Sequence, residues 1–295
     1  MFDRIFADYL VECGKLTEDN VKSIFSLESS KRVRLGVIAV SEKLMTIEQV
    51  NEVNQLQSVL DKRFGDIAIE KGYLNEEQVE RLLVLQGNAY LSFIQTVIDN
   101  NFLTMEETEE MLAKYQADFS LTTSNIEDLK SCDVSRIIPI FLFNTDENSL
   151  TLAGKVIRTM IRLIDYRAYI KKPTVVSEYK FDQLSSQAIN GDYSLLTAIA
   201  GPIESLRNAA CAFAGEDNVE CDEDVLDALS EFINCANGLY ASDMSNRDIN
   251  IDMDAPLSLG KPGTLKADSI LCIPIVACDR QFDLLIIYNQ EYSCN

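Results

Sequence analysis

The sequence contains no histidine among its 295 residues. Nucleophilic dyads of the Ser-His and Cys-His type are therefore excluded, and so is any metal site with an imidazole ligand. General acid–base chemistry is left to carboxylates, side-chain amides and water. This absence removes several large classes of enzyme mechanism before any motif is considered.

Positive charge is also scarce, because 26 lysine and arginine residues stand against 47 aspartate and glutamate residues, for a net charge of −21. Nucleic acids and anionic membrane surfaces need positive protein surface, so we expect neither as a partner. The N-terminal residues lack a basic segment followed by an apolar core, and no signal peptide is predicted. The longest apolar runs, such as residues 137–143, are too short to span a membrane. We expect a cytoplasmic protein.

The eight cysteines form no Cys-x-x-Cys pair. Cys211, Cys235 and Cys272 lie in apolar runs, where a free thiol behaves as a small hydrophobe, so we expect reduced thiols in the core.

The chain length favours two domains. A hydrophobic content of 47% and a charged content of 25% are typical of globular proteins rather than disordered ones.

The first 121 residues repeat with a period of 29. Segments beginning at Leu35 and Phe64 share glycine, isoleucine and alanine at their second, fourth and fifth positions, and the same register gives four units over about residues 6–121. Each unit predicts a short apolar helix, a turn and a longer helix. The longer helices are expected to begin after a capping residue, which is Thr17, Thr46, Asn75 or Thr104. Three of them have Gln49, Gln78 or Glu107 in the position that completes a capping box.

Two consecutive units also resemble a known ligand-binding module. Residues 34–57 and 63–86, which begin Arg-Leu-Gly and Arg-Phe-Gly and both end in glutamine, are similar to the tandem motif of the GspE N-terminal (MshEN-type) domain. That family binds cyclic di-GMP, so the resemblance implies a nucleotide site formed by Arg34, Gly36, Gln57, Arg63, Gly65 and Gln86. A guanidinium group can stack on guanine and pair with phosphate, and glycine permits close approach to the backbone. Lys43 departs from the motif, which has glycine there, whereas Gly72 supplies it in the second copy. A ligand-binding module and a purely structural helical array stay open as alternatives.

Residues 122–131 are polar and poorly periodic, and they predict a linker or a short helical connector between residues 1–121 and a second domain of residues 132–295. In that second domain, strands are predicted at residues 137–143, 174–181, 193–200, 249–253, 270–277 and 282–288. Pro139 confines the first of these to a sheet edge or a strand end. Helices are predicted at residues 150–167 and 202–214, and from about residue 222 onward. The expected fold is an α-helical repeat domain followed by an α+β domain with a largely antiparallel sheet.

The helix predicted from residue 222 carries an unusual polar stripe. Asp227, Glu231, Asn234 and Gly238 are spaced at i, i+4, i+7 and i+11, which places them on one face. A broad apolar face lies between them, formed by Leu226, Leu229, Phe232, Ile233, Ala236 and Leu239. A solvated helix face usually mixes lysine and arginine with acids, and a glycine within a helix costs about 1 kcal/mol relative to alanine. The stripe therefore indicates a site that another molecule approaches closely, with an ordinary amphipathic helix as the alternative.

The pattern Asp227-x-x-x-Glu231-x-x-Asn234-x-x-x-Gly238 resembles the active-site helix of the CheC/CheX/FliY family of chemotaxis phosphatases. The likeness extends over about residues 145–290. Its further elements are Gly201, the helix ending at Phe213-Ala214-Gly215, and Pro256 followed by Gly260. The resemblance implies a CheX-like domain with one Glu/Asn site, whose substrate is the aspartyl phosphate of a phosphorylated CheY-like response regulator.

In this family the chemistry needs no nucleophile and no metal of the phosphatase, because Mg²⁺ is held by the partner receiver. The resemblance assigns Asn234 to positioning the attacking water and Glu231 to contacting the partner. It assigns Asp227 and Gly238 supporting, partner-docking roles. Some relatives dimerise, so a homodimer is an open alternative.

Three hypotheses therefore stand: a phosphatase acting on a phosphorylated receiver, a non-catalytic cyclic-di-GMP effector or adaptor that docks a receiver, and a purely structural interaction protein. An intact Glu231 and Asn234 favour the first over the third, and the paired Arg34 and Arg63 keep the second open.

Overall fold

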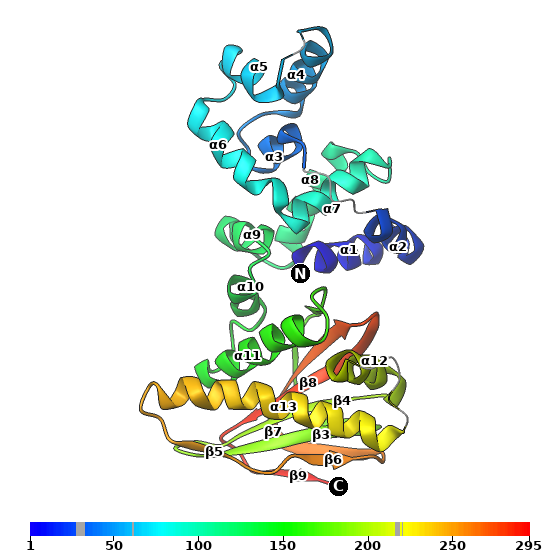
Figure 1. Cartoon of the computed structure of the whole chain (residues 1–295), viewed down its shortest axis with the longest axis vertical. Helices are drawn as coiled ribbons and strands as arrows, with labels where there is room; N and C mark the ends of the chain where they lie inside the picture. The colour runs from blue at the N-terminus through cyan, green and yellow to red at the C-terminus, as the bar shows by residue number, and fades with distance from the viewer. Residues whose placement is uncertain (28–32, 61, 216–218, 220) are drawn as a thin grey trace. The chain divides into compact units, whose positions relative to one another are not determined.

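The computed structural model describes residues 1–27, 33–60, 62–215, 219 and 221–295. The chain divides into two compact units, Phe2–Asp133 and Val134–Asn295, the second together with Met1. Both units are shown in Figure 1. None of the helices in the described ranges is both long and apolar enough to cross a membrane.

The first unit is helical and consists mainly of consecutive helix pairs. In chain order they are α1 (Phe2–Glu12) with α2 (Glu18–Leu27), α3 (Leu35–Ser41) with α4 (Ile47–Leu60), α5 (Phe64–Glu70) with α6 (Glu76–Val84), and α7 (Ala89–Asp99) with α8 (Met105–Asp118). A short 3-10 turn, η1 (Leu85–Gly87), stands between α6 and α7. The predicted alternation of a first and a second helix in each 29-residue unit is confirmed.

The turn within each pair has the same backbone geometry in all four units. Gly14, Lys43, Gly72 and Asn101 have φ values of 69°, 57°, 73° and 56°, in the left-handed region. At each position the N–H group donates to the carbonyl three residues earlier, and the next N–H donates to the carbonyl five residues before it. The replacement of glycine by Lys43 therefore leaves the turn intact, although a side chain disfavours this conformation.

The predicted helix caps are also confirmed. Thr46 and Gln49, Asn75 and Gln78, and Thr104 and Glu107 each exchange reciprocal side-chain to backbone hydrogen bonds. In the first unit, Thr17 makes the corresponding pair with Asn20. Each cap satisfies N–H groups that the first turn of a helix leaves without an intrahelical partner.

The interval expected as a linker or connector contains the helix α9 (Thr123–Lys130). Its N-terminus has a capping box between Thr122 and Asn125. Three hydrogen bonds tie its last residue to the helical unit. The Lys130 carbonyl accepts from Asn88 Nδ2 at 2.8 Å, and Lys130 Nζ donates to the Ser41 carbonyl and to Ser41 Oγ, both at 3.0 Å. The interval is therefore a packed helix of the first unit.

The second unit begins with α10 (Val134–Phe141), where the sequence predicted a strand at residues 137–143. That prediction is wrong. Ile137, Ile138 and Leu142 are buried, and Pro139 is exposed, which is the spacing of one helix face rather than the alternation of a strand. The buried residues Ile138 and Leu142 belong to the main core of this unit, which also includes residues of α11 (Glu147–Leu163).

The remaining elements build one antiparallel sheet with two further helices. The strands in the described part of the chain are β1 (Tyr169–Ile170), β2 (Thr174–Phe181), β3 (Gln183–Gly191), β4 (Leu195–Gly201), β5 (Ile251–Met253), β6 (Leu257–Leu259), β7 (Gly263–Ala277), β8 (Arg280–Tyr288) and β9 (Tyr292–Cys294). The helices α12 (Ile203–Ala214) and α13 (Asp222–Ser245) lie between β4 and β5 in the chain. The central order is β1-β7-β8-β4-β3-β5, while β2 and β9 pair with β7 and β6 pairs with β3. The predicted α+β fold with an antiparallel sheet is confirmed, although β3 and the short strands β1, β6 and β9 were not predicted.

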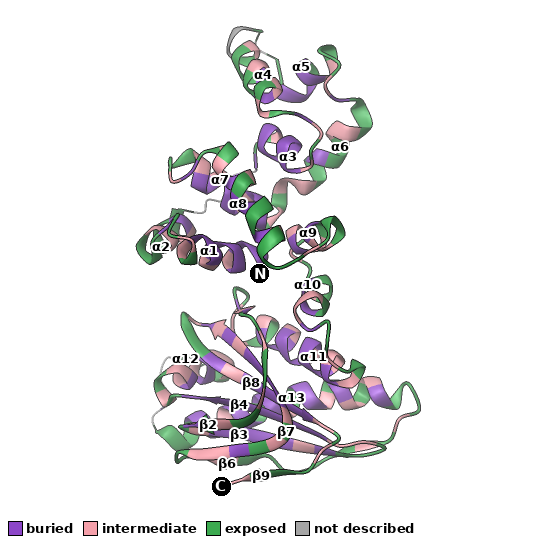
Figure 2. Cartoon of the chain, turned by 180° about the vertical axis from the view of Figure 1, so that it is seen from behind, coloured by how far each residue is buried: buried purple, intermediate pink, exposed green. Residues whose placement is uncertain are grey.

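Side chains from the two faces of the sheet form separate cores. On one face, Leu195 and Ile199 of β4 join the core shared with α11, α12 and α13. On the other face, Leu196, Ala198 and Ala200 of the same strand belong to a second, smaller cluster with residues of β2, β7 and β8. Figure 1 shows α13 running across the helical face of the sheet, and Figure 2 shows the largely exposed β2 from the opposite side.

Candidate functional site

The candidate site is built on α13, the 24-residue helix Asp222–Ser245. Cys221 precedes it as the N-cap residue, with Asp224 completing the capping box, so the helix begins where the sequence predicted. Three acids in the first turn, Asp222, Glu223 and Asp224, face the positive end of the helix dipole. The helix is therefore well anchored at its start.

The apolar face of α13 is buried as predicted, with one exception. Leu226, Leu229, Phe232, Ile233 and Ala236 are each at most 3% exposed. Leu239 is 37% exposed, so its predicted burial is wrong. Asn237 and Tyr240 are fully buried instead, because helical periodicity places them on the same face as Leu229 and Ile233, whereas Leu239 lies at the edge of that face.

The polar stripe lies on the outer face of α13. Asp227 and Glu231 are exposed, and Asn234 and Gly238 are partly buried. A Cβ atom added at Gly238 would meet only Met253 Cε, at 3.9 Å, which is an ordinary van der Waals distance. Packing within the chain therefore does not require a glycine at this position, and its role as clearance for a partner stays a prediction.

A cluster of four polar side chains lies between α13 and the sheet. Gln187 on β3 and Thr197 on β4 are directly opposite each other in the strand register, and Asn234 and Asn237 are three residues apart on the helix. Gln187 Nε2 donates to Asn234 Oδ1 at 2.9 Å and to the Asp254 carbonyl at 2.8 Å. Asn237 Nδ2 donates to Gln187 Oε1 at 2.9 Å, and Thr197 Oγ1 donates to Asn237 Oδ1 at 3.0 Å.

These four side chains, Asn234, Gln187, Asn237 and Thr197, are called the amide cluster below. Gln187, Asn237 and Thr197 are at most 2% exposed, so only Asn234 reaches the surface. Gln187 was not predicted as a site residue, because its strand, β3, was not predicted from the sequence. The signal that was present is Asn237, an amide on an otherwise apolar helix face, since a buried amide needs a hydrogen-bonding partner.

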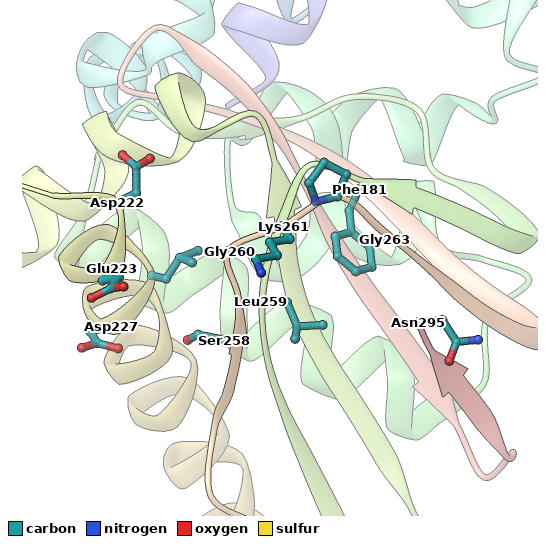
Figure 3. A pocket seen from close by; sticks show the side chains of 12 residues that line it. Phe181, Asp222, Glu223, Asp227, Ser258, Leu259, Gly260, Lys261, Gly263 and Asn295 are labelled. Carbon is teal, nitrogen blue, oxygen red and sulfur yellow. The ribbon is translucent and has the colours of Figure 1, made fainter.

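Asp227 lines a pocket of about 720 Å³ beside α13. One wall is formed by Asp222, Glu223 and Asp227 on the helix, and the segment from Ser258 to Gly263, including Lys261, lies opposite. Figure 3 shows these side chains around the opening, with Phe181 and Asn295 on its far side. Asp227 therefore borders a recess with both carboxylate and ammonium groups.

The residues predicted as a nucleotide site in the first unit are only partly brought together. Arg34, Gly36 and Gln57 line one pocket of about 360 Å³, together with apolar residues of α3, α4 and α5. Arg63, Gly65 and Gln86 are not among the residues that line it. The guanidinium group of Arg34 pairs with Asp99 on α7, and Gln86 Nε2 donates to the Val33 carbonyl at 2.6 Å.

Both motif glycines have a packing partner within the chain. A Cβ atom at Gly36 would come within 2.7 Å of Val50 Cγ1, and one at Gly65 would come within 3.0 Å of Val79 Cγ1. These are equivalent positions of consecutive units. Close helix packing is therefore sufficient to explain the glycines, whether or not a ligand also approaches them.

The chemistry available at the α13 site is that of carboxylates and an amide. Within the ranges that the structure describes, no group of three or more Cys, Asp or Glu side chains is placed to hold a metal ion.

All eight cysteines are free thiols, but Cys235 on α13 is exposed, so its predicted place in the core is wrong. Cys272 is buried as expected.

Residues 184–275, which contain α13 and most of β3, match the family model described as chemotaxis phosphatase CheX. The C-terminal half of the chain therefore carries a CheX-like domain. No match was found among curated proteins.

Solved structures that resemble this chain include CheX from Desulfovibrio desulfuricans, with 15% identity over 48% of this chain and 99% of that chain and a TM-score of 0.43. A CheC-like superfamily protein from Shewanella sp. PV-4 has 17% identity over 49% of this chain and 99% of that chain, with a TM-score of 0.43. A CheX–CheY–BeF3–Mg+2 complex from Borrelia burgdorferi has 14% identity over 49% of this chain and 98% of that chain, with a TM-score of 0.40.

Proposed function

We propose that the C-terminal unit hydrolyses the aspartyl phosphate of a phosphorylated CheY-like response regulator, with Glu231 and Asn234 as the residues that act on it. The single observation that carries the proposal is their arrangement on α13. Glu231 is exposed and Asn234 lies one helical turn further on, at the outer end of the amide cluster. The match of residues 184–275 to the chemotaxis phosphatase model supports the same conclusion.

The proposed mechanism relies on orientation and electrostatics. Hydrolysis of a phosphoryl group needs a water molecule held in line with the bond that breaks, and positioning supplies much of the catalysis in such reactions. Asn234 is proposed to hold that water through its amide. Glu231 is proposed to pair with a cationic side chain of the receiver and so to fix the docked geometry. Any Mg²⁺ is assigned to the receiver.

The test is the rate of phosphate loss from receiver domains encoded in the same genome, phosphorylated with a small-molecule donor. The wild-type protein is expected to accelerate the decay of one receiver, and Asn234→Ala is expected to abolish the acceleration. Cys235→Ala is a matched control, because Cys235 is the exposed neighbour of Asn234 on the same helix and has no proposed role. If Asn234→Ala retains full activity, the proposed mechanism is wrong.

A second candidate function is an adaptor that binds cyclic di-GMP and docks a receiver without hydrolysing its phosphate. It is favoured by the pocket that Arg34, Gly36 and Gln57 line. Cyclic di-GMP that binds only the folded state should raise the apparent thermal stability of the chain. Arg34→Ala should remove that shift, whereas Arg81→Ala should not, because Arg81 is an exposed arginine outside the pocket. No shift with the wild-type protein would exclude this candidate.

A further inference from the structure

We infer that Gln187 is a positioning residue for Asn234, because it determines which edge of the Asn234 amide faces the surface. This inference rests on the proposed phosphatase function. Its starting point is the 2.9 Å hydrogen bond from Gln187 Nε2 to Asn234 Oδ1, which joins a buried strand residue to the partly exposed residue of the site.

The direction of this hydrogen bond follows from a backbone atom. The Asp254 carbonyl oxygen can only accept, and it lies 2.8 Å from Gln187 Nε2. The Gln187 amide must therefore turn its NH₂ group towards Asp254, which places the same NH₂ group against Asn234. Asp254 is itself fixed to β3, since its N–H donates to the Ala188 carbonyl at 2.9 Å.

The oxygen of the Gln187 amide also has the partner that this orientation requires. Its Oε1 accepts from Asn237 Nδ2 at 2.9 Å, and Asn237 Oδ1 in turn accepts from Thr197 Oγ1 at 3.0 Å. A hydroxyl group can rotate to donate or to accept, so Thr197 adapts to the chain of amides and does not set its direction. The polarity of the whole amide cluster is therefore set by the Asp254 carbonyl.

The consequence for Asn234 is a fixed orientation. With Oδ1 turned inward to Gln187, its Nδ2 group is the outward edge, and in the described part of the chain that group donates to no protein acceptor. The opposite orientation would place two NH₂ groups against each other. Asn234 therefore presents N–H donors to the surface, suited to the free lone pair of an attacking water or to a phosphoryl oxygen.

Packing between α13 and the sheet does not by itself require polar side chains at the positions of the amide cluster. The amide cluster lies within a region whose neighbours on α13 are Phe232, Ile233 and Ala236, all fully buried. Apolar side chains of similar size would fill the volume without the cost of burying amide groups. A connected polar network is instead suited to holding one surface amide in a single orientation, which is a requirement of the proposed chemistry.

The first test is independent of activity. Solvent exchange of side-chain amide protons can be measured by NMR on the full chain labelled with ¹⁵N. The Gln187 NH₂ group should be strongly protected, because it is hydrogen-bonded to Asn234 and to the Asp254 carbonyl and its side chain is buried, and the Asn234 NH₂ protons should exchange quickly. Protected Asn234 protons would mean that the amide is turned the other way, and the inference would be overturned.

The second test measures catalysis with the receiver that responds to the wild-type protein. Gln187→Met keeps the length of the side chain and removes its hydrogen bonds. We expect kcat to fall by about ten- to a hundredfold with little change in KM, because the docking surface is intact and only the orientation is lost. If Gln187→Met instead lowers kcat, raises KM and lowers the free energy of unfolding together, the residue has a structural role and the inference is overturned.

Ser185→Ala is the matched control. Ser185 is a fully buried residue of the same strand, and its Oγ donates to the Leu226 carbonyl of α13 at 3.0 Å. This variant removes a buried contact between β3 and α13 without touching the amide cluster, so its kcat should stay near the wild-type value. If the wild-type protein accelerates no receiver, the proposed function fails, while the exchange measurement still decides the orientation of Asn234.

Discussion

A substitution at Gly36 tests quantitatively whether close packing between the helices of the repeat requires glycine at this position. A Cβ atom at this position would lie 2.7 Å from Val50 Cγ1 and 3.2 Å from Phe64 Cε2. Valine on a helix has one strongly preferred rotamer, so Val50 cannot easily turn its methyl group away. Gly36→Ala should therefore force α3 and α4 apart or strain the Val50 side chain.

The expected magnitude combines two opposing effects. Overpacking a well-packed contact costs about 1–3 kcal/mol, whereas alanine in place of glycine in a helix gains up to about 1 kcal/mol. We expect Gly36→Ala to lower the free energy of unfolding by about 1–2 kcal/mol. Gly65→Ala is the internal control. Its Cβ would approach Val79 Cγ1 at 3.0 Å, and the partly exposed Val79 has more room to yield.

The assay is urea unfolding of the full chain, with hydrogen exchange by mass spectrometry to locate the loss within α3 to α5. Adding Val50→Ala to Gly36→Ala removes the methyl group that clashes, so the double variant should be more stable than the sum of the single effects predicts, by about 1 kcal/mol or more. If Gly36→Ala is as stable as the wild-type protein, or if the effects of Gly36→Ala and Val50→Ala are additive, helix packing is not the reason for this glycine.

Three further predictions concern local features of the two units. Lys43→Gly should stabilise the chain by about 0.5–1 kcal/mol in denaturant unfolding, because Lys43 adopts a left-handed φ of 57° where Gly72 stands in the next unit; a loss of stability would contradict this. Burial raises the pKa of Glu109, so its contribution to stability is present at low pH and is lost as the pH rises through that raised pKa. As the pH rises above about 4.5, the free energy of unfolding should fall less for Glu109→Gln than for the wild-type protein, and an equal fall would refute the assignment. Burial raises the pKa of Cys272 to about 12, so at about pH 8 a thiol reagent should modify the exposed Cys235 far sooner, as mass spectrometry of the digested protein would show; equal rates would be inconsistent with this burial.

Features encoded by short-range interactions were predictable from the sequence. The 29-residue period, the helix pairs and the capping boxes at Thr46, Asn75 and Thr104 depend on residues a few positions apart. The polar stripe of α13 was predictable for the same reason, since a helix of 24 residues fixes which side chains share a face. Glu231 and Asn234 therefore emerged as candidates without any tertiary information.

Other elements depended on contacts between distant segments. Residues 137–143 form a short apolar run, which is compatible with a strand or a buried helix. In the structure α10 extends to Phe141, and Ile138 packs in the main core of the second unit. The strand β3 is rich in serine and glutamine, so it lacks the apolar alternation that predicts a strand. Ser185 and Gln187 find hydrogen-bonding partners only because α13 and the segment at Asp254 pack against this strand.

The sequence by itself determined the repeat array, the amphipathic helix and the identity of the residues on its outer face, because these follow from backbone periodicity and local hydrogen bonds. Tertiary structure alone decided what lies beneath that face. Gln187 and Asn234 are separated by 47 positions in the chain, and a strand register together with the Asp254 carbonyl brings their amides into contact. No local pattern encodes such a contact, because it exists only when the sheet and the helix are packed together.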